Sequence, residues 1–335
     1  MAATIYDIAR EAGVSIATVS RVQNNHTSVS PATRKKVLEV CERLSYQPNV
    51  PARNLALQSS SLISAVVPMV GNYFYNEVLR GFQDRLKDSD FELMVFTAQN
   101  LQDVDPQLSR AVKSGLSAGA LLLSTPVNEK TYSLVKNSRS PVVVVDTRHP
   151  DIDTVSVDNE YGGHLATSFL ISKGYRKIGL VMASKESQPA AARYRGYVRA
   201  ITESGMMVDD QLVYVAEGDY HHGYSETSGY QGAKKLLEAS PDIDAIFATS
   251  DVQAFGAMHA VRESGLNIPD DVAVIGYDDL SVSRHLGLTT VRQPMFEMGR
   301  TAVERLLSHI DRHTMHVSET VFYPDLVERA TTKTL

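Results

Sequence analysis

A short segment near the amino end carries side chains that are suited to contacting the edges of base pairs. Residues 16–22 have the pattern of a helix that buries Val19 and Val22 on one face. The other face then presents small apolar, hydroxyl and guanidinium groups: Ile16, Ala17, Thr18, Ser20 and Arg21. Such side chains can contact the hydrogen-bonding base edges and thymine methyl groups of the DNA major groove. The pattern predicts a helix that reads DNA.

An amphipathic helix directly before this segment completes a helix-turn-helix. Apolar residues at helical spacing form one buried stripe: Ile5, Ile8, Ala9 and Ala12. Thr4 and Asp7 have the spacing of a capping box at the start of this helix. Gly13 permits a left-handed turn, and Ser15 can cap the next helix. Paired short helices also occur in helical domains that bind no DNA, so the pattern alone leaves both interpretations open.

A third helix is expected from Ser30 to about Leu44. Ser30 is a good N-cap residue, and Pro31 suits the first helical position. Its apolar side should close a three-helix core through Val37, Leu38, Cys41 and Leu44. The chain has a single cysteine, which excludes an intramolecular disulfide.

Charge is divided unevenly along the chain. Residues 1–60 contain seven Lys or Arg and four Asp or Glu, so this part carries +3, whereas the whole chain carries −6. A basic head joined to an acidic body fits a head that meets phosphate groups. No apolar stretch approaches the ~20 residues that a membrane span needs, and no signal peptide is recognisable. We therefore expect a cytoplasmic protein.

The segment after the head has the composition of an interdomain connection. Residues 46–61 contain two prolines, a short helix-compatible run and three serines. Asn49 can cap a helix from Pro51 to Leu57, but this stretch is too short to be stable as an isolated helix. It is either a plain flexible linker or a hinge that becomes helical when a second copy and DNA pack on it.

From Leu62 onward, apolar runs typical of buried strands alternate with amphipathic helices. The runs lie at residues 62–67, 93–96, 120–123, 142–145, 178–181, 245–248 and 272–275. This alternation predicts parallel sheets that helices cover on both faces. Because the alternation starts afresh after Tyr161, we expect two lobes of similar size with a ligand cleft between them.

Polar side chains follow several of these strands, at the sheet edge where ligands bind in such folds. They are Asp146, Ser250, Asp251 and Asp278. Arg193 is expected to open a helix of the second lobe, and aromatic faces come from Tyr73, Phe74, Tyr75 and Tyr220. Carboxylates, a guanidinium and aromatic rings together suit a polyhydroxylated or planar small ligand. Taken singly, each of them is as readily explained as a helix cap or another structural residue.

The sequence lacks the common enzyme motifs. No Gly-x-Gly-x-x-Gly follows a strand, and neither a phosphate-binding Gly-Lys-Ser/Thr loop nor a His-Glu-x-x-His motif occurs. The ten histidines are scattered without the spacing of metal ligands. The adjacent Asp278 and Asp279 should point apart rather than form a catalytic pair. We expect no catalytic residue, no metal and no cofactor.

The whole chain resembles the LacI/GalR family of bacterial transcription regulators. In the head, the resemblance rests on Ile5-Tyr6-Asp7-Ile8-Ala9, Gly13-Val14-Ser15, Thr18-Val19-Ser20-Arg21-Val22 and Tyr46-Gln47-Pro48-Asn49. In the body, it rests on Arg193-Tyr194-Arg195-Gly196, Val274-Ile275-Gly276-Tyr277-Asp278-Asp279, Thr289-Thr290-Val291-Arg292-Gln293-Pro294 and Leu326-Val327-Glu328-Arg329.

The resemblance implies a small all-α helix-turn-helix head and an α/β body. The body would be two-lobed and periplasmic-binding-protein-like, with doubly wound parallel sheets. The implied domains are a DNA-binding head at 1–47, a hinge helix or linker at 48–60, and an effector-binding and dimerisation body at 61–335. The first lobe would comprise about 61–160 plus 292–321, and the second about 161–291 plus 322–335.

The resemblance also implies which residues contact DNA. Ile16, Ala17 and Arg21 would read bases, and Arg21 can donate two hydrogen bonds to a guanine. Phosphate or groove-edge contacts would come from Thr4, Tyr6, Ser15, Thr18, Ser20, Asn24, Thr33, Tyr46 and Asn49. Leu55 would wedge into the minor groove, with Ala52 and Arg53 beside it. Pro51 departs from the β-branched or small residue that is usual at its position.

For the effector pocket, the resemblance implies Phe74, Asp146, Arg193, Tyr220, Ser250, Asp278 and Gln293. Ser250 stands where an asparagine is common, which shortens one hydrogen-bonding arm and favours a ligand other than the commonest sugars. The chain ends soon after the second lobe without a heptad-bearing tail, so a homodimer is expected.

The sequence thus predicts a cytoplasmic, nucleoid-associated repressor that binds pseudo-palindromic double-stranded operator DNA. A small-molecule effector, a sugar or sugar derivative, would control its affinity for DNA, and no membrane would take part. The alternatives are an activator or dual regulator built from the same parts, a solute-binding protein with no DNA role, and an enzyme.

Overall fold

The chain divides into a small helical unit, residues 1–60, and a larger α/β unit, residues 61–335. The computed structural model describes residues 3–23, 27–46, 60–69, 71–98, 101–112, 116–217, 223–312 and 317–333. Among these residues, no helix combines the length and the apolar character needed to cross a lipid bilayer.

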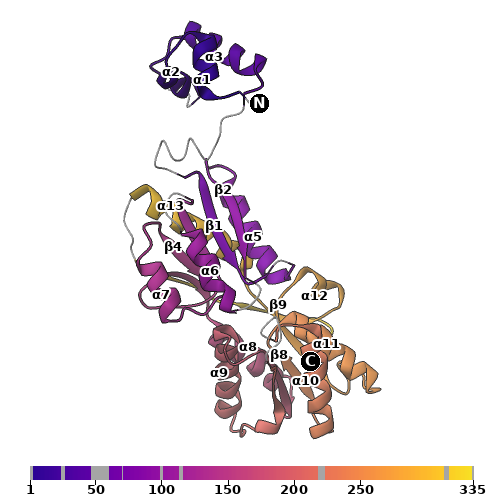
Figure 1. The fold of residues 1–335 in the computed structure, drawn as a ribbon. Helices are drawn as coiled ribbons and strands as arrows, with labels where there is room; N and C mark the ends of the chain where they lie inside the picture. The colour runs from indigo at the N-terminus through magenta and orange to yellow at the C-terminus, as the bar shows by residue number, and fades with distance from the viewer. Residues whose placement is uncertain are drawn as a thin grey trace. The chain divides into compact units, whose positions relative to one another are not determined.

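The first unit is a three-helix domain around a small apolar core (Figure 1). Its helices are α1 (Ile5–Ala12), α2 (Ile16–Gln23) and α3 (Pro31–Arg43). The buried residues of the core are Ile8, Ala9, Ala12, Val19, Val22, Val37 and Val40. As predicted, Thr4 and Asp7 form a capping box at the start of α1, and Gly13 ends it with a φ of 60°. Ser15 accepts a hydrogen bond from Thr18 N, at 3.1 Å, and so caps α2.

The prediction for α3 was wrong at one position. Leu38 was expected in the core but is 51% exposed. Helix α3 instead packs through Val37 and Val40, and each residue of a helix is turned by about 100° from its neighbour, so Leu38 faces outward. Cys41 and Leu44 are half-buried against the core.

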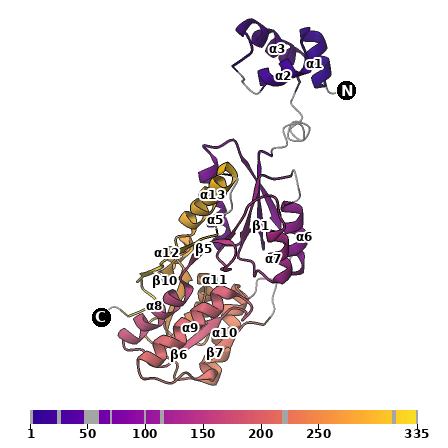
Figure 2. The same cartoon turned by 90° about the vertical axis from the view of Figure 1, so that its left-hand side faces the viewer.

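The first lobe of the second unit is a parallel sheet of six strands in the order β11-β5-β4-β3-β1-β2. These strands are β1 (Leu62–Val67), β2 (Glu92–Thr97), β3 (Gly119–Leu123), β4 (Val142–Val145), β5 (Asp153–Val157) and β11 (Glu319–Phe322). The helices are α5 (Tyr73–Leu86), α6 (Leu101–Ala111), α7 (Glu129–Lys136) and α13 (Met295–Arg312). Figure 2 shows α5 and α13 on one face of the sheet and α6 and α7 on the other.

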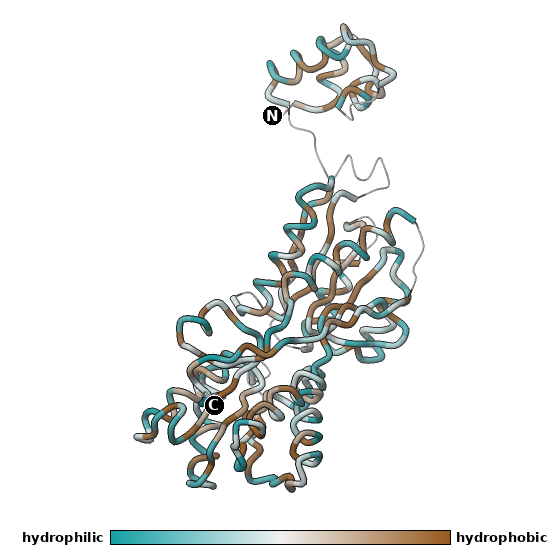
Figure 3. Tube along the Cα trace, turned by 180° about the vertical axis from the view of Figure 1, so that it is seen from behind, coloured by the Kyte–Doolittle hydropathy of each residue, from teal (hydrophilic) through white to brown (hydrophobic). Residues whose placement is uncertain are grey.

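The second lobe repeats this plan with the strand order β12-β10-β9-β8-β6-β7. Its strands are β6 (Ile178–Met182), β7 (Val213–Val215), β8 (Ala245–Ala248), β9 (Ala273–Asp278), β10 (Thr289–Arg292) and β12 (Asp325–Val327). Its helices are α8 (Asn159–Ser172), α9 (Gln188–Glu203), the 3₁₀ turn η1 (Asp210–Leu212), α10 (Glu226–Ala239), α11 (Asp251–Glu263) and α12 (Ser281–His285). Only β12 is antiparallel to its neighbour. In both lobes the central strands form the apolar interior (Figure 3), whereas the outer strands β2, β7, β11 and β12 are partly exposed.

All seven strands predicted from apolar runs are present, but five short strands have no such run: β5, β7, β10, β11 and β12, of which β12 overlaps the segment 326–329 that resembles the family's closing strand. Strand β5 shows the reason. Its residues are all buried, but the polar residues Asp153, Thr154 and Ser156 interrupt any apolar run. The fold accommodates Asp153 because Arg305 Nε of α13 donates to both of its oxygens, at 2.9 and 3.0 Å.

The chain passes between the lobes three times. The first crossover, residues 157–159, joins β5 to α8. The second, residues 292–295, joins β10 to α13, and the third, residues 322–325, joins β11 to β12. Each lobe is therefore assembled from segments that lie far apart in the sequence.

Candidate functional site

A cavity lies between the two lobes, at the carboxyl ends of strands from both sheets. In the first lobe, Ser124 follows β3 and Asp146 follows β4; in the second, Ser250 follows β8 by two residues and Asp278 ends β9. These residues line the cavity, which has a volume of about 50 Å³. The placement follows from parallel topology, because all strands of one sheet end at the same edge.

Six of the seven predicted pocket residues line this one cavity: Phe74, Asp146, Arg193, Ser250, Asp278 and Gln293. The seventh, Tyr220, lies outside the described residues. Asp251, which also follows a predicted strand, does not line the cavity. The carboxylate of Asp251 instead accepts hydrogen bonds from Leu280 N, at 2.8 Å, and from Ser283 Oγ, at 2.5 Å, and so ties α11 to the segment after β9.

Arg193 reaches the cavity because α8 and α9 pack backbone against backbone. A Cβ atom at Gly163 would lie 2.2 Å from Arg193 O, and one at Gly196 would lie 2.1 Å from Glu160 O, so both positions require glycine. The prediction that Arg193 opens this helix was wrong, since α9 begins at Gln188 after the N-cap Ser187. Arg193 therefore lies one turn and a half into the helix, on its buried side.

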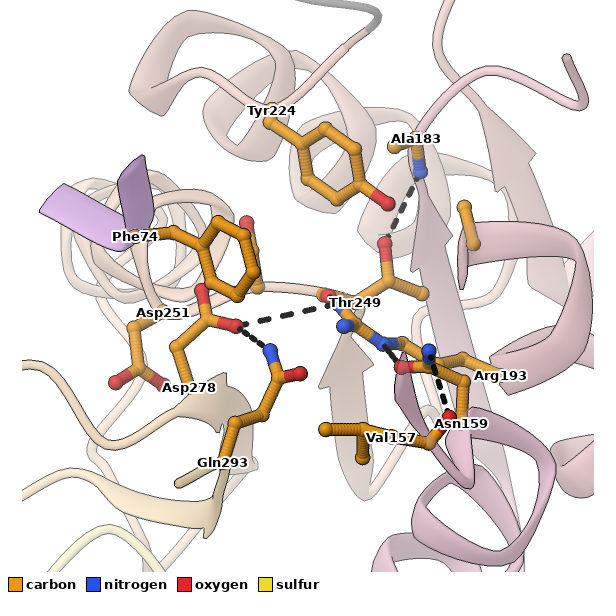
Figure 4. A network of polar contacts seen from close by, with 12 residues as sticks. Phe74, Val157, Asn159, Ala183, Arg193, Tyr224, Thr249, Asp251, Asp278 and Gln293 are labelled. Carbon is orange, nitrogen blue, oxygen red and sulfur yellow. Dashed lines mark hydrogen bonds and ion pairs between the residues drawn. The ribbon is translucent and has the colours of Figure 1, made fainter. Parts of the chain in front are cut away.

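The guanidinium of Arg193 is held on three sides, two of which are the hydrogen bonds to Asn159 and Thr249 in Figure 4. Its Nε donates to Asn159 Oδ1 at 2.9 Å, and its Nη1 donates to Thr249 O at 2.5 Å. The guanidinium carbon lies 3.7 Å from the ring centre of Tyr277. Arg193 Nη1 also lies 4.0 Å from Asp278 Oδ1, so a buried cation and a buried carboxylate face each other across the cavity wall.

Asp278 and its neighbour Asp279 point apart, as predicted. Asp278 Oδ1 accepts a hydrogen bond from Gln293 Nε2 at 2.6 Å, whereas Asp279 binds Arg292 and Arg329 on the other side of the chain. Both aspartates have positive φ, 124° and 57°, and this backbone turn at the end of β9 separates their side chains. Burial raises the pKa of Asp278, while the charge of Arg193 opposes the shift.

Two buried acceptor atoms at the cavity have no hydrogen-bond partner among the described residues. Asp146 Oδ2 accepts from Ser124 Oγ at 2.7 Å, but Asp146 Oδ1 accepts nothing. Gln293 Oε1 is likewise unpartnered. Burial raises the pKa of Asp146, against the charge of Arg193 and the Ser124 hydrogen bond. An unpaired buried acceptor is costly, so a ligand that donates hydrogen bonds would relieve both atoms.

Ser250 has a structural role as well as a place in the cavity. Its Oγ accepts from Gln253 N at 3.2 Å and so caps α11. The same side chain therefore caps α11 and lines the cavity.

Sequence reasoning missed several residues of the cavity. Ser124 carried the same signal as Asp146, since it directly follows a predicted strand. Tyr224 also lines the cavity and shares a hydrogen bond with Ser187 Oγ at 2.9 Å; burial raises its pKa to about 12, so it remains protonated. Asn159 does not line the cavity but holds Arg193, and it had no such signal because its position depends on how α8 packs on α9.

The predicted DNA-contacting residues of the head and hinge differ in their exposure and in their other contacts. Exposed side chains are Tyr6, Ile16, Ala17 and Arg21, and Arg21 forms no ion pair with any described residue. Residues that also hold the head together through caps are Thr4, Ser15, Thr18 and Thr33, while Ser20 and Tyr46 are half-buried. Asn24, Asn49, Ala52, Arg53 and Leu55 lie outside the described residues.

No group of three or more His, Cys, Asp or Glu residues in the described part of the chain has the arrangement to hold a metal ion.

Comparisons with known proteins agree with this architecture. The bacterial regulatory proteins of the lacI family match residues 4–49, and a periplasmic binding protein-like domain matches residues 167–332. The chain is 36% identical to catabolite control protein A of Priestia megaterium, over 99% of this chain and 100% of that protein. The lac repressor dimer bound to operator and an anti-inducer has a TM-score of 0.87 and 26% identity, over 99% of each chain. The regulator CelR in complex with cellobiose has a TM-score of 0.75 and 30% identity, over 98% of this chain and 99% of that chain.

A helix-turn-helix head and a two-lobed binding body define a transcription regulator with a DNA-binding and an effector-binding domain. The chain belongs to the lacI family of bacterial regulatory proteins. Several of its relatives are named as transcriptional regulators or repressors, so it is a regulator and not an enzyme.

Proposed function

We propose that this protein is a repressor whose homodimer binds a pseudo-palindromic operator, and that a sugar or sugar derivative in the interlobe cavity controls its affinity for DNA. In this proposal, residues 1–47 bind DNA, 48–60 are the hinge and 61–335 bind the effector and dimerise. The protein would act on chromosomal DNA, and hence in the cytoplasm.

The two unpartnered acceptor atoms are the main support for a sugar as the effector. Asp146 Oδ1 and Gln293 Oε1 require donors, and the hydroxyl groups of a sugar supply them. Apolar and aromatic side chains of the same cavity, Phe74 and Val252 among them, suit the C–H faces of a sugar ring. Saccharides occur in related complexes: CelR is described with cellobiose, and a LacI family regulator of Enterococcus faecium is described with ribose.

The two lobes are joined by the three crossovers at residues 157–159, 292–295 and 322–325, with the cavity between them. A rotation at the three crossovers opens the cavity without unfolding either lobe. Through this hinge motion, effector binding changes the angle between the lobes and thereby acts on the DNA-binding head.

The test begins with a thermal-shift screen of mono- and disaccharides, followed by calorimetry with each compound that stabilises the protein. Operator is selected from a random pool of palindromic duplexes, and binding is followed by fluorescence anisotropy with and without the compound. Arg193→Ala and Asp278→Ala should abolish effector binding and leave operator affinity nearly intact. Glu238→Ala, an exposed site on α10, is the control. If effector binding is unchanged in both pocket variants, this cavity is not the effector site.

A further inference from the structure

Asn159 joins the cavity to the first crossover. It is the first residue of α8 and is buried. Its Oδ1 accepts from Arg193 Nε at 2.9 Å, and its Nδ2 donates to Val157 O at 3.4 Å. Val157 is the last residue of β5, a strand of the first lobe, whereas Arg193 belongs to the second lobe. One amide therefore contacts the end of the first lobe and the cation of the cavity (Figure 4).

The second crossover carries a similar link. Gln293 follows β10, and its Nε2 donates to Asp278 Oδ1 at 2.6 Å. Each of two crossovers thus contributes an amide that binds one member of the Arg193–Asp278 pair. Gln293 lines the cavity and can touch a ligand itself, but Asn159 does not line it and acts only through Arg193.

Arg193 has little freedom to move without disturbing Asn159. The guanidinium lies against the Tyr277 ring and is bonded to Thr249 O, both within the second lobe. Its charge makes the hydrogen bond to Asn159 stronger than one between neutral groups. A shift of the guanidinium toward a ligand must either break the bond to Asn159 or move the amide, and with it the residues next to Val157.

We propose that Asn159 is a positioning residue that couples the orientation of Arg193 to the first crossover, and thereby to the angle between the lobes. The role of the ligand in this coupling rests on the proposed function. The coupling itself exists in the free protein and is tested there, so its failure and the failure of the effector proposal are distinguishable.

The test measures the interlobe distance in the full-length protein without ligand. Spin labels are placed at Glu129→Cys on α7 and Glu238→Cys on α10, both exposed, in a Cys41→Ser background. Asn159→Leu removes the acceptor, whereas Asn159→Asp keeps an oxygen for Arg193 Nε. The leucine variant should broaden the distance distribution at least about twofold, as expected for a released hinge. The aspartate variant keeps the bond to Arg193 and loses only the longer bond to Val157 O, so it should broaden the distribution less.

Arg193→Lys is a second variant that leaves Asn159 in place, in case the leucine variant does not fold. It retains the charge but lacks the Nε–H donor, so it should broaden the distribution as much as Asn159→Leu. The double variant should not broaden the distribution further, because the Asn159–Arg193 hydrogen bond is the interaction that the two substitutions both remove. Glu160→Gln, in an exposed ion pair with Arg195, is the control and should have no effect. Three results would overturn the proposal. The first is a wild-type distance distribution in both Asn159→Leu and Arg193→Lys, and the second is a distribution as broad in Asn159→Asp as in Asn159→Leu. The third is additive broadening in the double variant.

Discussion

The guanidinium carbon of Arg193 lies 3.7 Å from the centre of the Tyr277 ring, and both side chains are buried. The stack joins α9 to β9 one residue before the cavity carboxylate Asp278. The Tyr277 hydroxyl has no hydrogen-bond partner among the described residues, so the ring holds the arginine in place. A desolvated cation–π contact of this kind is worth about 2 kcal/mol.

Two substitutions separate the ring of Tyr277 from its hydroxyl. Tyr277→Phe keeps the ring and removes an unpaired polar atom, so the free energy of unfolding should change by less than about 1 kcal/mol. Tyr277→Leu removes the stack and leaves a void, and should lower the free energy of unfolding by about 2–4 kcal/mol. Urea denaturation measures both. Equal losses in the two variants would show that the hydroxyl matters and the ring does not.

Ser250 should tolerate asparagine but not alanine. Ser250→Ala removes the N-cap of α11 and should lower the free energy of unfolding by about 1 kcal/mol. Ser250→Asn keeps a good capping group, so the melting temperature should stay near that of the wild type, while the longer side chain enters the cavity and changes which sugars bind. Thermal melting and the sugar screen measure the two effects. A full loss of stability in Ser250→Asn would contradict the capping role.

Asp146 should make stability depend on pH. Its folded pKa is raised, so as pH rises above about 4 the unfolded chain releases this proton first, and the folded state is disfavoured by up to ~1.4 kcal/mol per pH unit until the folded pKa is reached. Asp146→Asn lacks this effect. The melting temperature of the variant relative to the wild type should therefore rise by about 2–4 °C per pH unit across this window.

Melting curves between pH 4 and 8 measure this difference. Asp270→Asn, at an exposed position, is the matched control for removal of one carboxyl group. An offset for Asp146→Asn that stays constant across this pH range would mean that burial does not raise the pKa of Asp146.

Arg21 should discriminate between bases. Arg21→Ala should weaken binding to the selected operator by about 1–3 kcal/mol and relax the preference at one base pair of each half-site. Arg262→Ala, an exposed arginine of α11, is the charge-matched control. Anisotropy titrations on the operator and on single-base variants measure the effect. An equal loss of affinity on every DNA sequence would show that Arg21 contacts phosphates and not bases.

The sequence by itself determined the elements whose signals are local. The capping box at Thr4, the turn at Gly13 and the cap at Ser30 depend on residues three or four positions apart, and all three are present as predicted. The seven apolar strands were predicted because a strand buried on both faces leaves a continuous apolar run. Their parallel order then brought Asp146 and Asp278 to a common cavity.

Only the tertiary structure decided the features that depend on distant partners. Strand β5 is buried with Asp153 at its start because Arg305, far along the chain, neutralises that carboxylate. Asn159 meets Arg193 because two glycines let α8 and α9 approach closely, and no periodicity of the sequence reports that distance. Local patterns are set by backbone geometry within a few residues, whereas the pairing of buried polar groups depends on which segments the folded chain brings together.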